Sequence, residues 1–325
     1  MRPQLQQYVQ ENEHCDAPLV TVGMPVWNRA DVLDRAVQSV LAQDHRNWEL
    51  IIVDDGSTDS SADVARAYRA DQRVRLIQHP VNRGVCAAIN TCLDHGRGEW
   101  ITLLGSDDEM LPHALSRMLE VAALQNGASI DAVTCSCFDS RTGRFSGTGI
   151  SESGMLDART IATRCRGEFW GITKRSLIGE LRFNEAIRGG DEDTLWYRVN
   201  VKAHRYYVHE ALRVYHTEGG DRLSKGRRPL ARERETSVFN DYRAIIMQEE
   251  AYLAILRELA PERYRAKMQR ACAAFLIKRD FALARQAHTE LVAIGGGRLG
   301  RLALRLGFIL GPWWIRTLRA VRRTV

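Results

Sequence analysis

Adjacent aspartates occur in two short stretches of this 325-residue chain, each directly after an apolar run. Residues 53–59 read VDDGSTD, and residues 103–109 read LLGSDDE. A carboxylate fixed at the end of a strand can accept hydrogen bonds from a nucleobase imide or a ribose hydroxyl, and an unmatched buried acceptor is costly. The first stretch therefore predicts a nucleotide-binding turn. Helix capping by Asp54, Asp55 and Ser57 is the alternative interpretation.

The second stretch has the chemistry of a divalent-cation site. Asp107 and Asp108 close an apolar segment, where adjacent carboxylates repel each other unless a cation or hydrogen-bond donors compensate them. Carboxylate oxygens are hard ligands that suit Mg²⁺ or Mn²⁺ and leave coordination positions open for phosphate oxygens. A solvated acidic turn is the alternative, because aspartate is common in turns.

Apolar segments that alternate with helical patterns must position these acids. The order favours βαβ units and a parallel sheet that is covered on both faces. Ligands bind beyond the carboxyl ends of such strands. Polar residues follow all four expected strands. Pro112 is expected in the first turn of the helix at 111–124. Strands are expected at 19–28, 48–57, 74–80 and 99–108, and helices at 29–43, 59–70, 84–96 and 111–124.

Composition excludes several classes of protein. With 45% hydrophobic and 26% charged residues, the chain is typical of globular proteins. Residues 1–18 lack the apolar region of a secretory signal, and no stretch reaches the roughly 18 apolar residues of a membrane span. Seven cysteines without a CxxC pair predict reduced thiols in a cytosolic protein. The first strand is not followed by G-x-G-x-x-G, which argues against a dinucleotide-binding fingerprint.

The charged residues of the C-terminus are all arginines. Seven arginines and no acid occur from Arg298 onward, spaced mostly three or four residues apart. Leu, Ile, Phe and Trp fill the positions between them, which favours short amphipathic helices that lie in an anionic membrane interface. A packed terminal helix with solvated arginines is the alternative. Nucleic acid is not an expected partner, because no recognised binding motif accompanies the arginines.

Five ordered blocks between about residues 18 and 217 resemble the family 2 inverting glycosyltransferases with the GT-A fold. The resemblance implies an α/β fold, with a Rossmann-like, mostly parallel sheet flanked by helices and a C-terminal α-helical region. It also implies transfer of a sugar from a nucleotide-sugar donor, UDP-linked above all, to a lipid-linked or polysaccharide acceptor in bacterial envelope glycan synthesis. The blocks are VTVGMPVWNR, LAQDHRNWELIIVDDGSTD, NRGVCAAIN, GEWITLLGSDDEMLP and GGDEDTLWYRV.

The resemblance assigns roles to residues of the first three blocks. It places Pro25 and Asn28 beside the nucleotide and Asp55 on the base or ribose. It places Arg83 near the uracil or the diphosphate. The opening stretch, VDDGSTD, is thereby expected to hold the nucleotide of a sugar donor.

The resemblance also implies a divalent cofactor, Mn²⁺ or Mg²⁺. Asp107 matches the metal-binding last acid of the family's DxD motif. Gly105 stands where many members have the first Asp, so Ser106 or water would have to substitute there. His216 resembles a histidine near the diphosphate or metal, and an ordinary hydrogen-bonded histidine is the equal alternative.

The general base is expected in the block GGDEDTLWYRV. With Trp196 and Arg198 setting the register, Glu192 is the counterpart of the family's base and Asp191 is the close alternative. Proton transfer needs a heavy-atom reach of about 2.6–3.2 Å, so the longer glutamate side chain matters. Asp193 is accounted for equally well by the preference for acids at a helix N-terminus.

The domain organisation follows from these blocks and from the helical pattern after them. A tail at 1–16, a glycosyltransferase domain at 17–225, a helical region at 226–296 and a basic membrane-associating tail at 297–325 are expected. The protein is then expected in the cytoplasm, peripherally associated with the inner face of the cell membrane. A catalytically impaired relative that binds nucleotide sugar is the alternative function.

Overall fold

The computed structural model describes residues 17–124, 129–188, 193–217 and 231–295. The chain divides into two compact units, Met1–Phe183 with Val199–Glu218, and Asn184–Arg198 with Gly219–Val325. The tails expected at 1–16 and 297–325 lie outside the described residues, as does the boundary expected at residue 225. The domain boundaries therefore stay predictions.

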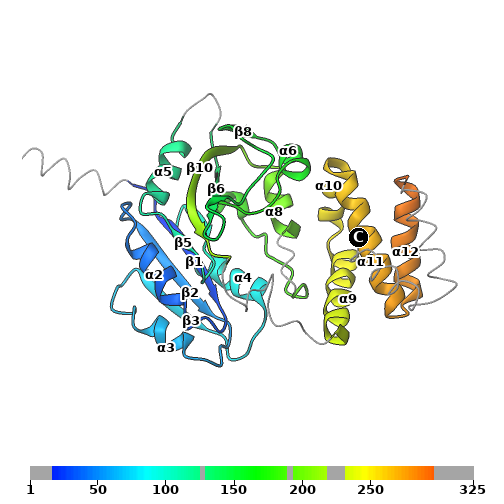
Figure 1. The fold of residues 1–325 in the computed structure, drawn as a ribbon, viewed down its shortest axis with the longest axis horizontal. Helices are drawn as coiled ribbons and strands as arrows, with labels where there is room; N and C mark the ends of the chain where they lie inside the picture. Colours follow the sequence, from blue (N-terminus) through cyan, green and yellow to red (C-terminus); the bar gives the residue numbers. More distant parts are fainter. Residues whose placement is uncertain (1–16, 125–128, 189–192, 218–230, 296–325) are drawn as a thin grey trace, which may run out of the picture. The chain divides into compact units, whose positions relative to one another are not determined.

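Among the described residues, ten strands form one sheet in the first unit (Figure 1). Eight follow in the order β3-β2-β1-β4-β9-β6-β10-β5, while β7 pairs with β6 and β8 pairs with β10. The bounds are β1 (Val20–Val26), β2 (Trp48–Asp54), β3 (Val74–Gln78), β4 (Trp100–Leu103), β5 (Glu109–Met110), β6 (Ala132–Asp139), β7 (Arg144–Phe145), β8 (Gly154–Leu156), β9 (Phe169–Lys174) and β10 (Arg205–Tyr215).

The predicted α/β fold is confirmed, and its parallel part consists of β3, β2, β1 and β4. These strands are shorter than the apolar runs predicted, because the polar residues at the carboxyl ends leave the ladder and form turns. The other half of the sheet is mixed. Strand β9 is antiparallel to β4 and β6, β10 is parallel to β6, and the short β5, which the pattern did not predict, is antiparallel to β10.

Helices cover both faces of the parallel strands. Buried residues of α2 (Leu33–Leu41), α3 (Ser61–Arg66) and α5 (Ala114–Ala122) pack with Val22 and Leu50 on one face. Buried residues of α4 (Val85–His95) pack with Ile51 and Val53 on the other. The expectation that Pro112 lies in the first turn of α5 is wrong, because Leu111 still donates its amide to Leu212 and the helix starts at Ala114.

The second unit is helical in its described part. Helices α11 and α12 are joined by three residues, and Cys272 Sγ of α11 lies 3.4 Å from the Ala284 carbonyl oxygen of α12. None of the helices in the described ranges is both long and apolar enough to cross a membrane. The remaining helices of the described residues are α6 (Ala158–Thr163), α7 (Arg175–Ile178), α8 (Asp193–Asn200), α9 (Ala231–Gln248), α10 (Glu250–Leu259), α11 (Pro261–Ile277) and α12 (Phe281–Ala293).

A buried carboxylate ties the amino-terminal edge of the parallel strands together. Glu49 Oε1 accepts hydrogen bonds from Thr21 Oγ1 (2.7 Å) and from the Arg97 amide (2.6 Å), and Oε2 pairs with Arg75 (3.1 Å). Burial alone would raise the pKa of Glu49, but the Arg97 and Thr21 hydrogen bonds and the Arg75 charge outweigh it, so the pKa is lowered. The ionised form therefore stabilises the fold.

Replacing Glu49 by Gln should lower the free energy of unfolding at pH 7 by about 2 kcal/mol, the scale of lost hydrogen bonds to a buried charge. A lowered pKa means that this contribution is complete above the ordinary value of 4.5 and is lost as the pH falls through the folded-state pKa. Urea unfolding at pH 7 and at decreasing pH should show the gap to wild type closing. Glu99→Gln, whose carboxylate is 57% exposed, is the control and should change little. A gap that widens in acid would contradict this account.

Candidate functional site

The carboxyl ends of β1, β2, β3 and β4 lie along one edge of the sheet, because these strands are parallel. Loops at residues 27–32, 55–60, 79–84 and 104–108 leave this edge. The polar residues that the sequence places after each strand are therefore brought together. Such an edge is where open α/β sheets bind ligands.

The first two loops are fastened to each other. The Asn28 amide donates to Ser57 Oγ (3.0 Å), and Asn28 Oδ1 accepts from the Thr58 amide (2.8 Å). The Arg29 amide donates to Ser61 Oγ (2.7 Å). Asn28 has a φ of 52°, a left-handed conformation that asparagine tolerates better than most residues. The predicted nucleotide-binding residue Asn28 is thus part of a rigid double loop.

Asp55 fastens the third loop. Its Oδ1 accepts from the Arg83 amide (2.9 Å) and from His79 Nδ1 (2.7 Å), and its Oδ2 accepts from the Gly84 amide (2.8 Å). Both Asp55 and His79 are buried, and His79 Nε2 lies 2.9 Å from Thr91 Oγ1. A carboxylate offers about four acceptor positions, so Asp55 keeps capacity for one more donor. Its predicted contact with a base or ribose stays a prediction.

The interpretation that Asp54, Asp55 and Ser57 cap the helix is wrong. Asp54 Oδ1 accepts from the Ser57 amide (3.1 Å) and Oδ2 from Gln78 Nε2 (3.2 Å), so this side chain holds the turn rather than α3. The first amide of α3, that of Ser61, is bound by Asp59 (2.9 Å). Burial would raise the pKa of Asp59, but the hydroxyl and amide of Ser61 outweigh it, so the pKa is lowered.

Gly56 allows the second and third loops to approach closely. Its φ is +67°, in the left-handed region where a side chain is strained. A Cβ atom there would lie 2.6 Å from the Val81 carbonyl carbon and 2.7 Å from the Asn82 amide nitrogen. Both of these are backbone atoms. The glycine of VDDGSTD is therefore required by the packing of loop 79–84 on loop 55–60.

Three consecutive acids, Asp107 and Asp108 of the fourth loop and Glu109 at the start of β5, each face an arginine. Arg29 Nε lies 3.9 Å from Asp107 Oδ2, in an ion pair between a side chain that is 16% exposed and one that is 28% exposed. An arginine of β10 and an arginine of α2 form ion pairs with the other two acids. The pairs are Arg213 with Asp108 (3.4 Å) and Arg35 with Glu109 (3.2 Å). The carboxylates are therefore compensated by the protein itself.

Arg213, which forms the ion pair with Asp108, is buried. Arg213 also lies 3.5 Å from Glu168 Oε2. Burial lowers the pKa of a guanidinium, but the neighbouring Cys137, Asp108 and Glu168 outweigh it, and the pKa of Arg213 is raised. The guanidinium is permanently charged and holds the acidic turn against β10.

His216 lies beside the acidic turn, where the sequence predicts it. Its amide donates to Asp108 Oδ1 (3.0 Å), and its Nε2 donates to Glu109 Oε1 (2.6 Å). The other ring nitrogen, Nδ1, is buried and has no hydrogen-bond partner among the described residues. Glu109 therefore fixes the ring and leaves Nδ1 as the atom available to a ligand.

The donor set of the predicted metal site is small. The described part of the chain holds no group of three or more His, Cys, Asp or Glu that could bind a metal. The carboxylate of Asp107 is the least engaged of the turn, since the ion pair that it forms with Arg29, at 3.9 Å, is beyond hydrogen-bond distance. One carboxylate with phosphate oxygens as further ligands suits Mg²⁺. The residues fit an ion that arrives with a diphosphate.

Gly105 is accounted for by the same turn. A Cβ atom at this position would lie 2.8 Å from Asp108 Oδ2 and 3.1 Å from Asp107 Oδ1. The two carboxylates thus occupy the space in which a first acid of a DxD motif would begin. Ser106, the predicted substitute, is buried in the turn.

Of the remaining predicted site residues, Pro25 and Arg83 are described by the structure and the two candidate bases are not. Pro25 is half-buried in β1 opposite Val53, and the Arg83 side chain is exposed on the third loop. Both stand at the predicted edge. The two candidate bases, Asp191 and Glu192, lie outside the described residues.

Sequence reasoning missed several residues of this edge. Trp27, which follows β1 directly, is 46% exposed and offers an aromatic face next to Asn28. An exposed aromatic after a strand was a signal that could have found it. His79 and the three arginines of the acidic turn gave no such signal, because their partners are distant in sequence.

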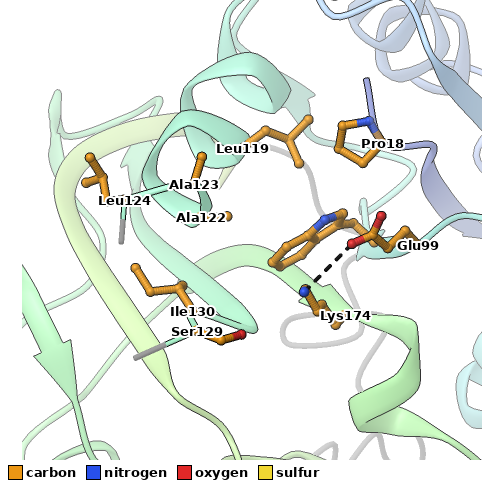
Figure 2. A pocket seen from close by; sticks show the side chains of 10 residues that line it. Pro18, Glu99, Leu119, Ala122, Ala123, Leu124, Ser129, Ile130 and Lys174 are labelled. Atoms are coloured by element: carbon orange, nitrogen blue, oxygen red, sulfur yellow. Dashed lines mark ion pairs between the residues drawn. The ribbon is translucent and has the colours of Figure 1, made fainter. Parts of the chain in front are cut away.

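A hollow of about 330 Å³ lies at the opposite edge of the sheet (Figure 2). Pro18 precedes β1, Trp100 begins β4, and an ion pair of 3.7 Å joins Lys174 to Glu99 among the lining residues. The lining lacks the aspartates and arginines described above. We therefore place the candidate site at the loops and not in this hollow. The lining consists of Pro18, Glu99, Trp100, Leu119, Ala122, Ala123, Leu124, Ser129, Ile130 and Lys174.

Comparison with known sequences identifies relatives. Residues 21–179 match the family model described as Glycosyl transferase family 2. The chain is 31% identical over 217 residues to the GalNAc(5)-diNAcBac-PP-undecaprenol beta-1,3-glucosyltransferase of Campylobacter jejuni. This match covers 64% of this chain and 68% of that protein. It is 43% identical over 105 residues to the putative colanic acid biosynthesis glycosyl transferase WcaA of Escherichia coli, a match that spans 31% of this chain and 37% of that protein.

Comparison with solved structures concerns the fold. Residues 1–349 of TarS from Staphylococcus aureus, in a crystal structure with UDP-GlcNAc, match with a TM-score of 0.60 and 16% identity. The match covers 90% of this chain and 92% of that one. At this identity the likeness establishes a shared fold, that of a GT-A glycosyltransferase, and the predicted fold class is confirmed.

Gly56→Ala should lower the free energy of unfolding by about 2 kcal/mol or more, the cost of a strained left-handed residue with a backbone clash added. Chemical denaturation of the two proteins measures it. Gly154→Ala is the matched control, because a Cβ atom there meets nothing within 4 Å, and it should change stability little. Equal stability of the Gly56 variant and wild type would show that loop 79–84 does not pack on Gly56 as described.

Proposed function

The chain belongs to glycosyltransferase family 2, and from this premise we propose that it transfers a sugar from a UDP-linked donor to a lipid-linked or polysaccharide acceptor, with inversion at the sugar carbon. The observation that supports the proposal best is the compensated acidic turn of Asp107 and Asp108. It stands at the same sheet edge as the loops fastened by Asn28 and Asp55. A nucleotide on those loops would direct its diphosphate toward that turn.

The nucleotide would be held by the first three loops. Pro25 and Asn28 would flank it, Asp55 would use its remaining acceptor position on the base or ribose, and Arg83 would reach the uracil or the diphosphate. The exposed ring of Trp27 offers a face on which a base can stack. The loops are fixed by their mutual hydrogen bonds, which lowers the ordering cost of binding.

The diphosphate would lie at the acidic turn. We assign Asp107 to a divalent ion, Mn²⁺ or Mg²⁺, with His216 Nδ1 and the Ser106 hydroxyl near the phosphates. When bound, such an ion stabilises the negative charge that develops on the departing nucleoside diphosphate. Glu109 would orient His216 for this role through the 2.6 Å hydrogen bond to Nε2.

A carboxylate in residues 188–193 would act as general base. Glu192 is our first assignment and Asp191 the second, from their place in the family's block. The base would take the proton of the acceptor hydroxyl as that oxygen attacks the sugar carbon. The bond to the diphosphate breaks on the opposite side of the carbon, which inverts its configuration.

The acceptor class is proposed from the Campylobacter jejuni relative. Its name describes a glucosyltransferase acting on a sugar chain linked to undecaprenyl diphosphate. We infer for this chain a lipid-linked or polysaccharide acceptor in bacterial glycan synthesis. A lipid-linked acceptor lies at a membrane surface, so we also propose a peripheral position at the inner face of the cell membrane.

Turnover of nucleotide sugars tests the function. A panel of UDP-sugars with Mn²⁺ should reveal donor hydrolysis or transfer, and Glu192→Gln should lower turnover by about 100-fold or more, the usual contribution of a general base. Donor affinity should stay near that of wild type. If Asp191→Asn has this effect and Glu192→Gln does not, the assignment of the base moves by one residue. Donor binding without any turnover would favour the catalytically impaired relative.

We also propose that residues 297–325, which lie outside the described residues, attach the enzyme to anionic lipid. Each arginine near an anionic surface contributes about 1 kcal/mol, so a few of the seven suffice for reversible binding. The full chain should sediment with anionic liposomes at low salt, and less so as salt rises. A chain ending at Ile294 should stay in the supernatant. Equal sedimentation of the two proteins would refute the attachment.

A further inference from the structure

His79 is a buried histidine of the ligand edge that lies between the family blocks and receives no role from them. Its side chain is 6% exposed, and that of its partner Asp55 is 3% exposed. Nδ1 lies 2.7 Å from Asp55 Oδ1, and a carboxylate oxygen only accepts, so Nδ1 carries a proton and donates it. Nε2 lies 2.9 Å from Thr91 Oγ1 of α4. The imidazole therefore links the carboxylate of Asp55 to α4.

The loop that begins at His79 is fastened without the imidazole. The amides of Arg83 and Gly84 donate to the Asp55 carboxylate at 2.9 and 2.8 Å, and the His79 amide donates to the Asp54 carbonyl oxygen at 2.9 Å. Backbone groups thus already hold this loop on the end of β2. The imidazole adds a further donor to the Asp55 carboxylate, and this donor acts on the orientation of that side chain.

The donors around Asp55 leave one of its acceptor positions open. Oδ1 accepts from the Arg83 amide and from His79, which uses both of its positions. Within the described part of the chain, Oδ2 accepts from the Gly84 amide alone and keeps one position. Because the fold fixes these donors, the carboxylate presents its open acceptor in a fixed direction. Such a site suits a single N–H group of a ligand.

We propose that His79 is a positioning residue that makes Asp55 selective for a uracil base. The inference rests on the proposed function, since it takes the ligand of this edge to be a uridine nucleotide. Uracil offers an imide N–H to the open acceptor, whereas cytosine has an acceptor nitrogen at the same place in its ring. Two buried acceptors that face each other are costly, so a carboxylate held in place rejects cytosine. Without the donor from His79, Asp55 can turn, and the preference for uracil falls.

Replacing His79 by asparagine or by glutamine separates the roles of its two nitrogens. Covalent geometry places the amide nitrogen of asparagine where Nδ1 stands, and that of glutamine where Nε2 stands. His79→Asn therefore keeps the donor to Asp55, and His79→Gln keeps the contact with Thr91. Calorimetric titration with UDP and with CDP, each with Mn²⁺, gives the two dissociation constants. His79→Gln should reduce the preference for UDP at least about tenfold, the scale of one charge-assisted hydrogen bond, and His79→Asn should keep most of it.

His45→Gln is the matched control. It makes the same change at a histidine whose Nε2 lies 3.0 Å from the Pro18 carbonyl oxygen, at the opposite edge of the sheet. This variant should bind UDP and CDP as wild type does. If the imidazole of His79 served only to tie the loop to Thr91, His79→Asn would be the more damaging of the two substitutions.

The inference is wrong if His79→Gln keeps the wild-type preference for UDP, including the case in which both affinities fall by the same factor. It is also wrong if His79→Asn loses as much of the preference as His79→Gln does. Wild type that does not prefer UDP to CDP would refute the inference and leave the glycosyltransferase activity standing. The proposed function itself fails in a distinguishable way, namely if wild type binds neither UDP nor any UDP-sugar with Mn²⁺.

Discussion

The site depends on charge balance among three consecutive carboxylates at the tip of β4. Asp107, Asp108 and Glu109 would repel one another if left to themselves. Three arginines, one each from the first loop, α2 and β10, face them at 3.2–3.9 Å. Since β10 belongs to the mixed half of the sheet and the first loop to the parallel half, this balance joins the two halves at the ligand edge. The protein's own arginines therefore hold the three acids together.

A second constraint fixes the loops around that turn. Asp55 holds the backbone of loop 79–84 through two amides, and Gly56 admits that loop at a distance no side chain would permit. Asp55 and Gly56 of VDDGSTD thus hold the loops of the protein together. A bound nucleotide would use the hydrogen-bond acceptor position of Asp55 that these contacts leave open. Such a fixed edge suits an enzyme whose catalysis depends on positioning and electrostatic stabilisation of a leaving group, because little has to be ordered when the donor binds.

The sequence was informative where the determinants are local. Continuous apolar runs predicted β1 to β4, and the polar residues after them predicted the edge and the place of Asn28, Asp55 and Asp107. What escaped prediction depends on contacts between distant segments. Strand β5 is defined by its pairing with β10. The sequence gives no sign that Arg29, Arg35 and Arg213 pair with the acids, because the fold alone brings these segments together. His79 gains its partner Asp55 in the same way. The assignments of Asp191 and Glu192 rest on sequence alone.

The central claim is that the donor nucleotide binds at the loops after β1, β2, β3 and β4. Hydrogen–deuterium exchange of the full chain with saturating UDP and Mn²⁺ tests this most directly. The account predicts slower exchange in peptides that cover residues 27–30, 55–58, 79–84 and 104–109, with no change in residues 118–124 at the opposite hollow. Protection confined to the peptides around that hollow, with the four loops unchanged, would contradict it.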